Sequence, residues 1–118
     1  MDLPHPTSCI LWTDPEQLRD LRMETVTVFE EDDHFRRALL KCPECGQLYF
    51  YQMREEVDFD GDDPVYRTYI PVASADQAAT LAKVSQFELM TIHLALHSDW
   101  PADQETSTIF WSRATTPA

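Results

Sequence analysis

Short runs of β-branched, aromatic and alternating apolar residues recur along the chain between charged or turn-forming residues, and such runs are typical of strands. The predicted strands cover residues 24–29, 35–41, 48–59, 65–70 and 108–111. The Asp60-Gly61 dipeptide is a hairpin signal between the third and fourth of these strands. We therefore expect the middle of the chain to form an antiparallel meander.

Helix starts are marked by polar capping residues that precede apolar stretches. The cap pairs are Asp14 with Gln17, Ser74 with Gln77, and Ser85 with Glu88. The predicted helices cover residues 15–22, 75–83 and 86–97. The last two are expected to be separate helices, because Ser85 offers a fresh start rather than a continuation.

These elements predict an α+β fold, in which an antiparallel sheet of four or five strands carries two or three helices on one face. A chain of 118 residues is long enough for one core and too short for two. A single domain is therefore expected over residues 1–118, with a short disordered tail after residue 113.

The third predicted strand is unusually aromatic, with different side chains on its two faces. Tyr49, Tyr51 and Met53 share one face, whereas Leu48 and Phe50 share the other. One face must form the core. The other either presents tyrosine and methionine as a binding surface or is covered by helices.

The charge of the chain is strongly negative, with 9 Lys and Arg against 21 Asp and Glu and a net charge of −12. Nucleic acids and anionic membrane surfaces repel such a protein, so neither is an expected partner. The acidity either maintains solubility or steers the protein toward a basic protein partner. The candidate partner-binding residues are Glu30, Glu31, Asp32, Asp33, Asp58, Asp60, Asp62 and Asp63.

The most specific chemical motif is the knuckle Cys42-Pro43-Glu44-Cys45-Gly46. Two cysteines at this spacing can hold one metal ion from a single turn, and the glycine permits the positive φ that such a turn requires. The motif resembles the knuckle of zinc-ribbon and rubredoxin-type proteins, in which Cys-Pro-x-Cys-Gly sits on a β-hairpin. The resemblance covers these five residues and the flanking strands, and it implies Cys42 and Cys45 as zinc ligands.

A zinc ribbon has a second cysteine pair, which this chain lacks, and structural zinc takes four protein ligands. His93 and His97 are four residues apart, so on the predicted helix they project from one face and could complete the site. If that face instead points to water, the two histidines form only a polar stripe. Cys9, His34 and His5 are the reserve candidates.

Two other interpretations of the knuckle stay open. It could keep its turn geometry without a metal, or it could be a redox pair of the thioredoxin type. A redox pair needs a helix N-terminus to lower the thiol pKa, whereas the residues after Gly46 are typical of a strand. Cys9, standing alone near the N-terminus, is most simply a small buried hydrophobe.

Motifs for catalysis are missing from the sequence. It contains neither a glycine-rich phosphate loop nor a serine elbow, and the acidic run 58–63 lacks the glycine position and the distal glutamate of an EF-hand. A secretion signal and an apolar run of about 18 residues are also missing, so a cytoplasmic protein is expected.

These features favour a small, acidic, non-catalytic protein-binding module. Its most concrete version is an immunity or antitoxin-type inhibitor of a basic, nuclease-like bacterial toxin, since acidity suits fast blocking of a cationic site. The alternative is a zinc-stabilised adaptor or regulator of transcription or translation, and a redox protein is the third hypothesis.

Overall fold

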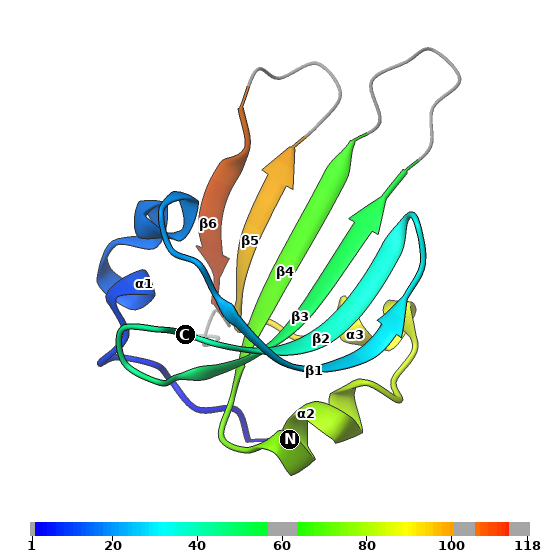
Figure 1. The fold of residues 1–118 in the computed structure, drawn as a ribbon, viewed down its shortest axis with the longest axis horizontal. Helices are drawn as coiled ribbons and strands as arrows, with labels where there is room; N and C mark the ends of the chain where they lie inside the picture. Colours follow the sequence, from blue (N-terminus) through cyan, green and yellow to red (C-terminus); the bar gives the residue numbers. More distant parts are fainter. Residues whose placement is uncertain (1, 57–63, 101–105, 114–118) are drawn as a thin grey trace, which may run out of the picture.

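The fold is α+β, built on one six-stranded antiparallel sheet whose strands follow chain order from β1 to β6 (Figure 1). The computed structural model describes residues 2–56, 64–100 and 106–113. The strands are β1 (Glu24–Glu31), β2 (Phe35–Lys41), β3 (Leu48–Glu55), β4 (Val65–Val72), β5 (Ala95–Trp100) and β6 (Thr108–Ser112). The helical segments are α1 (Ile10–Thr13), the 3₁₀ turn η1 (Pro15–Arg19), α2 (Ala75–Leu81) and α3 (Gln86–Leu89).

The sheet has six strands rather than the expected four or five, and β5 is the strand that the sequence did not predict. The predicted helix over residues 86–97 is wrong beyond its first turn, because α3 ends at Leu89 and the chain becomes strand from Ala95. As a strand, this segment pairs with β4 on one side and β6 on the other. It also buries Leu96 completely, whereas Phe87 on α3 and Met90 just after it remain 80% and 70% exposed.

The helix caps beyond residue 70 form as predicted. The backbone N–H of Gln77 donates to Ser74 Oγ over 3.2 Å, and that of Glu88 donates to Ser85 Oγ over 3.1 Å. The first predicted helix is instead a 3₁₀ turn that ends at Arg19. Within the described ranges, none of the helices has the length and apolar character needed to cross a membrane.

Both faces of the sheet are covered, so the expectation of helices on a single face is wrong. On one face, Leu11 and Leu18 of the N-terminal segment pack with Tyr49 and Leu96. On the other face, Leu81 of α2 and Leu89 of α3 pack with Phe50 and Ile70. The tyrosine face of β3 is therefore core, not a binding surface: Tyr49 is fully buried, Tyr51 is 7% exposed, and Met53 packs partly buried beside them.

Arg37 of β2 fastens the segment between α2 and α3 to the sheet. Its Nη1 donates to the carbonyl oxygens of Ala82 and Val84 over 3.2 and 2.7 Å, and its Nε donates to Gln52 Oε1 over 2.9 Å. The side chain is only 5% exposed, and burial lowers the pKa of the guanidinium. Since α2 and α3 are short, they need tertiary contacts of this kind to be stable.

Candidate metal centre and sheet pocket

The cysteine knuckle forms the turn between β2 and β3, as the motif predicts. Cys42 and Gln47 close it: the Cys42 N–H donates to the Gln47 carbonyl, and the Gly46 N–H donates to the Cys42 carbonyl, each over 2.9 Å. Gly46 has a φ of +81°, a conformation that an L side chain rarely adopts. The turn thus holds Cys42 and Cys45 on one end of the sheet.

Cys9, from the distant N-terminal segment, lies beside this turn. The sulfur atoms of Cys9, Cys42 and Cys45 all lie within 4.8 Å of one another, so one metal ion could bridge them. Cys9 and Cys42 are buried, whereas Cys45 is exposed and brings the cluster to the surface. The interpretation of Cys9 as a lone buried hydrophobe is therefore right about its burial but misses its neighbours.

The surroundings of Cys9 suit a metal-bound thiolate. Tyr49 Oη donates a hydrogen bond to Cys9 Sγ over 3.1 Å, which is the kind of support that fixes a sulfur ligand from behind. Burial raises the pKa of the Cys9 thiol to about 11, partly offset by that hydrogen bond. A bound metal ion would supply the positive charge that lets such a buried thiol ionise.

The sulfur triangle fits a zinc ion. Zinc–sulfur bonds of about 2.3 Å in a tetrahedron place the sulfurs roughly 3.8 Å apart, so the cluster needs only a small contraction. Three sulfur donors favour a soft metal over magnesium or calcium. A tetrahedral site has a fourth position, and among the described residues this cluster contains only the three cysteines.

His93 and His97 do not join the cysteines, which corrects the predicted Cys-pair and His-pair site. His97 is on β5, beside Ala95 on the face of the sheet that α2 and α3 cover, whereas Cys9 and Cys42 belong to the core on the other face. His93 is exposed between α3 and β5. The error follows from the helix prediction, since the two residues share a face only in a helix.

The other reserve histidines also lie outside the cluster. His5 is exposed and packs edge-on against Trp12, with the ring centroids 5.9 Å apart. His34 is at the opposite end of the sheet, in the turn between β1 and β2. Cys9 is therefore the reserve candidate that the structure brings to the knuckle.

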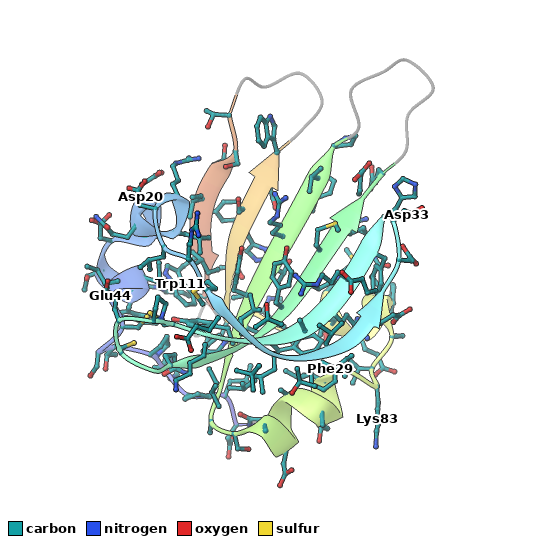
Figure 2. The ribbon with its side chains drawn as sticks, in the orientation of Figure 1. Asp20, Phe29, Asp33, Glu44, Lys83 and Trp111 are labelled. Carbon is teal, nitrogen blue, oxygen red and sulfur yellow. The ribbon has the colours of Figure 1, made fainter. Side chains whose placement is uncertain are left out.

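The acidic residues of the first predicted partner-binding cluster gather at the end of the sheet opposite the knuckle. Figure 2 shows Asp33 in the β1–β2 turn and Glu44 of the knuckle on opposite sides of the molecule. The turn is closed by Asp32 Oδ1, which accepts from the His34 N–H over 2.8 Å. Asp58, Asp60, Asp62 and Asp63 lie outside the described residues.

The β1–β2 turn lies directly beside the end of β3. The Glu55 N–H donates to the His34 carbonyl over 2.8 Å, and the His34 ring lies 3.4 Å from a Glu55 carboxylate oxygen. Glu56 follows at once and is exposed. The exposed carboxylates of Glu30, Glu31, Asp32 and Asp33 thus lie at the same end of the sheet as Glu55 and Glu56.

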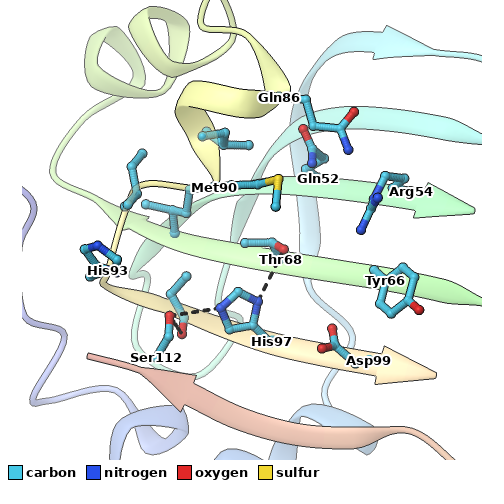
Figure 3. Close-up of a pocket in the computed structure, with 14 residues that line it drawn as sticks. Gln52, Arg54, Tyr66, Thr68, Gln86, Met90, His93, His97, Asp99 and Ser112 are labelled. Carbon is cyan, nitrogen blue, oxygen red and sulfur yellow. Dashed lines mark hydrogen bonds between the residues drawn. The ribbon is translucent and has the colours of Figure 1, made fainter. Parts of the chain in front are cut away.

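A pocket of about 340 Å³ opens between α3 and strands β3 to β6 (Figure 3). His97 lies at its centre, with Nδ1 3.5 Å from Thr68 Oγ1 and Nε2 2.9 Å from Ser112 Oγ. Its ring stacks on Phe110, with 5.1 Å between the centroids. Sequence reasoning missed this pocket because β5, which forms its floor, was predicted as helix.

Two titratable groups in the pocket are shifted by burial. Burial lowers the pKa of His97 below its ordinary value, which favours the neutral imidazole, although the charge of Asp99 opposes this effect. Burial raises the pKa of Asp99, and His97 and Arg54 oppose that shift. The pocket therefore holds a partly desolvated carboxylate beside a neutral ring.

The pair of His97 and Ser112 has the distance of a general base and its nucleophile, but this pair alone does not make an acyl-transfer site. Such a site also needs N–H donors for the oxyanion, and β5 uses its backbone groups in ladders with β4 and β6. Ser112 Oγ also lies 3.4 Å from the Ala95 carbonyl oxygen, which can accept a hydrogen bond from the Ser112 hydroxyl in place of His97. The geometry favours a His97 ring that is held in place by hydrogen bonds over one that activates Ser112.

Comparisons of the chain with protein-family models, with curated proteins and with solved structures found no match.

Proposed function

We propose that this protein is a zinc-stabilised, non-catalytic module that binds a basic protein partner through the acidic end of its sheet. The observation that carries the proposal is the contact between the β1–β2 turn and the end of β3 through His34 and Glu55. This contact brings the exposed carboxylates of the β1–β2 turn beside Glu55 and Glu56 in one negative surface. Such a surface steers a cationic partner and raises its association rate.

Arginines at this end only partly offset the acid. Arg36 lies 3.7 Å from Glu31, and Arg54 lies 3.0 Å from Glu56, so each is matched by one carboxylate. Glu30, Asp32 and Asp33 form no ion pair among the described residues. Their negative charge is available to a partner.

Zinc has a structural role in this proposal. Bound to Cys9, Cys42 and Cys45, it ties the N-terminal segment to the β2–β3 turn and secures one face of the core. The site lies at the far end from the acidic surface, so it shapes the module without contacting the partner. An inhibitor of a basic, nuclease-like bacterial toxin is the most concrete form of the function, because blocking a cationic active site needs charge and shape but no catalysis.

The experiment compares two variants that each remove three negative charges. The end variant carries Glu30→Gln, Glu31→Gln and Asp33→Asn, and the control carries Asp20→Asn, Glu24→Gln and Asp76→Asn at other exposed positions. Both are used, beside the wild type, to capture partners from the native host. We expect a basic protein to be retained by the wild type and the control and to be depleted at least about tenfold by the end variant.

The result that contradicts this proposal is equal retention by both variants. A zinc-stabilised adaptor whose partner is not basic gives that result, because its binding does not depend on the acidic end. The capture therefore separates the two functions that share a zinc site.

A further inference from the structure

The pocket beside α3 changes from charged at its outer end to apolar at its inner end, along the strands that form its floor. Three cross-strand rows follow from the register. The outer row holds Arg54, Tyr66 and Asp99, the middle row holds Gln52, Thr68 and His97, and the inner part holds Ile70, Ala95 and Ser112. Successive rows are about 7 Å apart, since they are separated by two residues of strand.

The inner end of the pocket is apolar. Leu89 and Ile92 lie above Ile70 and Ala95, and all four belong to the core on this face. Met90 also lines the pocket and is 70% exposed, so it forms part of the rim (Figure 3). A flexible thioether beside an apolar wall adapts to ligands of different shape.

The outer end holds an arginine and a carboxylate that form no ion pair with each other in the described part of the chain. Arg54 is engaged by Glu56 at 3.0 Å and lies 4.9 Å over the Tyr66 ring. Among the described residues, Asp99 forms no ion pair within 4.0 Å, although the charges of His97 and Arg54 act on its carboxylate. Figure 3 shows Arg54, Tyr66 and Asp99 on the same side of His97.

The middle of the pocket offers polar contacts without charge. Thr68 and Ser112 hold the His97 ring from its two nitrogens, and Phe110 supports it from one side. The His97 ring is thereby a fixed, flat surface between the outer row and the apolar inner end. A ligand that spans the three rows must be polar at one end and apolar at the other.

We propose that this pocket binds a small amphipathic amine, with its ammonium group at Asp99 and its apolar body between Ile92 and Ile70. An ammonium group donates three hydrogen bonds and neutralises a half-buried carboxylate, which an anion or a neutral head cannot do. The net charge of −12 also favours a cation over an anion. This site is separate from the proposed zinc centre, and its outer row borders the acidic end of the sheet through Arg54, which pairs with Glu56.

The test uses n-hexylamine, hexan-1-ol and hexanoate, which have unbranched alkyl chains of nearly equal length and differ in the charge of the head. Binding to the full chain at pH 7 is measured by calorimetry and by shifts of backbone amide signals. We expect saturable binding of hexylamine with shifts centred on β4 and β5, and binding at least about tenfold weaker for hexanol and hexanoate.

Two variants separate the head from the body of the ligand. Asp99→Asn keeps the shape of the side chain and should weaken hexylamine about tenfold while leaving hexanol unchanged. Ile92→Ser should weaken both compounds. Asp20→Asn, at an exposed position beyond η1, is the control and should change neither.

Circular dichroism and thermal melting establish that each variant is folded. The proposal is overturned if hexylamine shows no saturable binding to the wild type, if hexanol or hexanoate binds as tightly, or if Asp99→Asn retains the full affinity for hexylamine.

Discussion

Cys9 shows how much a single residue can decide at the cysteine cluster, our candidate metal site. Its buried sulfur lies beside those of Cys42 and Cys45, which belong to a turn more than 30 residues away along the chain. Tyr49 Oη donates a hydrogen bond to the Cys9 sulfur over 3.1 Å. A cysteine with these neighbours serves two purposes: it fills the core, and it provides the third sulfur that the knuckle lacks.

The first prediction therefore concerns Cys9→Ser. Loss of one thiolate should reduce bound zinc well below one ion per chain and lower the free energy of unfolding by about 2 kcal/mol or more, because metal binding stabilises only the folded state. Elemental analysis measures the zinc, and denaturant unfolding measures the stability.

His97→Gln is the matched variant for that prediction. His97 bonds to hydroxyl groups on the other face of the sheet, so its removal should leave the zinc content unchanged. Zinc that survives Cys9→Ser but is lost with His97→Gln would reinstate a Cys-pair and His-pair site. Cobalt substitution adds a check, since the intensity of the sulfur-to-metal absorption band should fall with Cys9→Ser.

Asp99 gives a second prediction at the same scale, on pH and stability. Burial raises its pKa in the folded state, so the stability associated with the protonated carboxyl is present at low pH and is lost as the pH rises through that pKa. At pH 7 the folded protein holds a desolvated charge that the unfolded chain solvates freely. Asp99→Asn should therefore raise the melting temperature at pH 7, and the gain should shrink toward pH 4.

The exposed Asp20→Asn serves as the comparison in the same melts. A rise in melting temperature that is equal for both variants, or that grows toward low pH, would contradict the assignment of a desolvated carboxylate in the pocket. A stabilising effect of Asp99→Asn would instead be typical of a residue retained for binding rather than for stability.

At the scale of elements, one arginine adds hydrogen bonds to the apolar contacts that hold α2 and α3 on the sheet. Arg37→Met keeps much of the side-chain volume but removes three donated hydrogen bonds, two of them to the carbonyl oxygens of Ala82 and Val84. We expect a loss of about 2–4 kcal/mol in the free energy of unfolding, because those carbonyls and Gln52 lose a charged donor inside the structure.

Arg22→Met at an exposed position is the control and should change the stability by less than about 0.5 kcal/mol. Denaturant unfolding of both variants checks this prediction. An equal effect would mean that Arg37 does not fasten the α2–α3 segment.

The elements also show what local pattern could and could not predict. Ser74 and Ser85 mark helix starts through contacts within three residues, so sequence alone identified them correctly. The end of α3 depends instead on pairing of β5 with β4 and β6, which lie far away along the chain. Leu94 and Leu96 fit a helical stripe and a strand equally well, and only tertiary contacts decide between them.

The candidate site also has one part that local sequence predicts and one part that tertiary contacts decide. The knuckle was predictable because its turn geometry is local, and Gly46 has the expected positive φ. The approach of Cys9 and the pocket around His97 were not, because both depend on which face of the sheet each segment covers. Residue type nominated Cys9 as a reserve ligand, but only the packing of Leu11 and Leu18 explains why it reaches the turn.

For the whole molecule, the two ends of the sheet have different roles in our account. The cysteine cluster lies at the knuckle end, whereas the exposed carboxylates of Glu30, Glu31, Asp32 and Asp33 lie at the end of the β1–β2 turn. Figure 2 shows these two ends by the labels Glu44 and Asp33. Because the two ends are separate, we expect that charge can be removed from the acidic end without disturbing the cysteine cluster.

The measurement that tests the proposed function most directly is the salt dependence of affinity for the captured basic partner. The dissociation constant is determined for the wild type, for the end variant (Glu30→Gln, Glu31→Gln, Asp33→Asn) and for the control variant (Asp20→Asn, Glu24→Gln, Asp76→Asn), at salt concentrations from about 0.05 to 0.5 M. Our account predicts that affinity falls with salt for the wild type and the control, and that the end variant binds about tenfold more weakly with a flatter dependence. Equal affinities and equal slopes for all three proteins would contradict it.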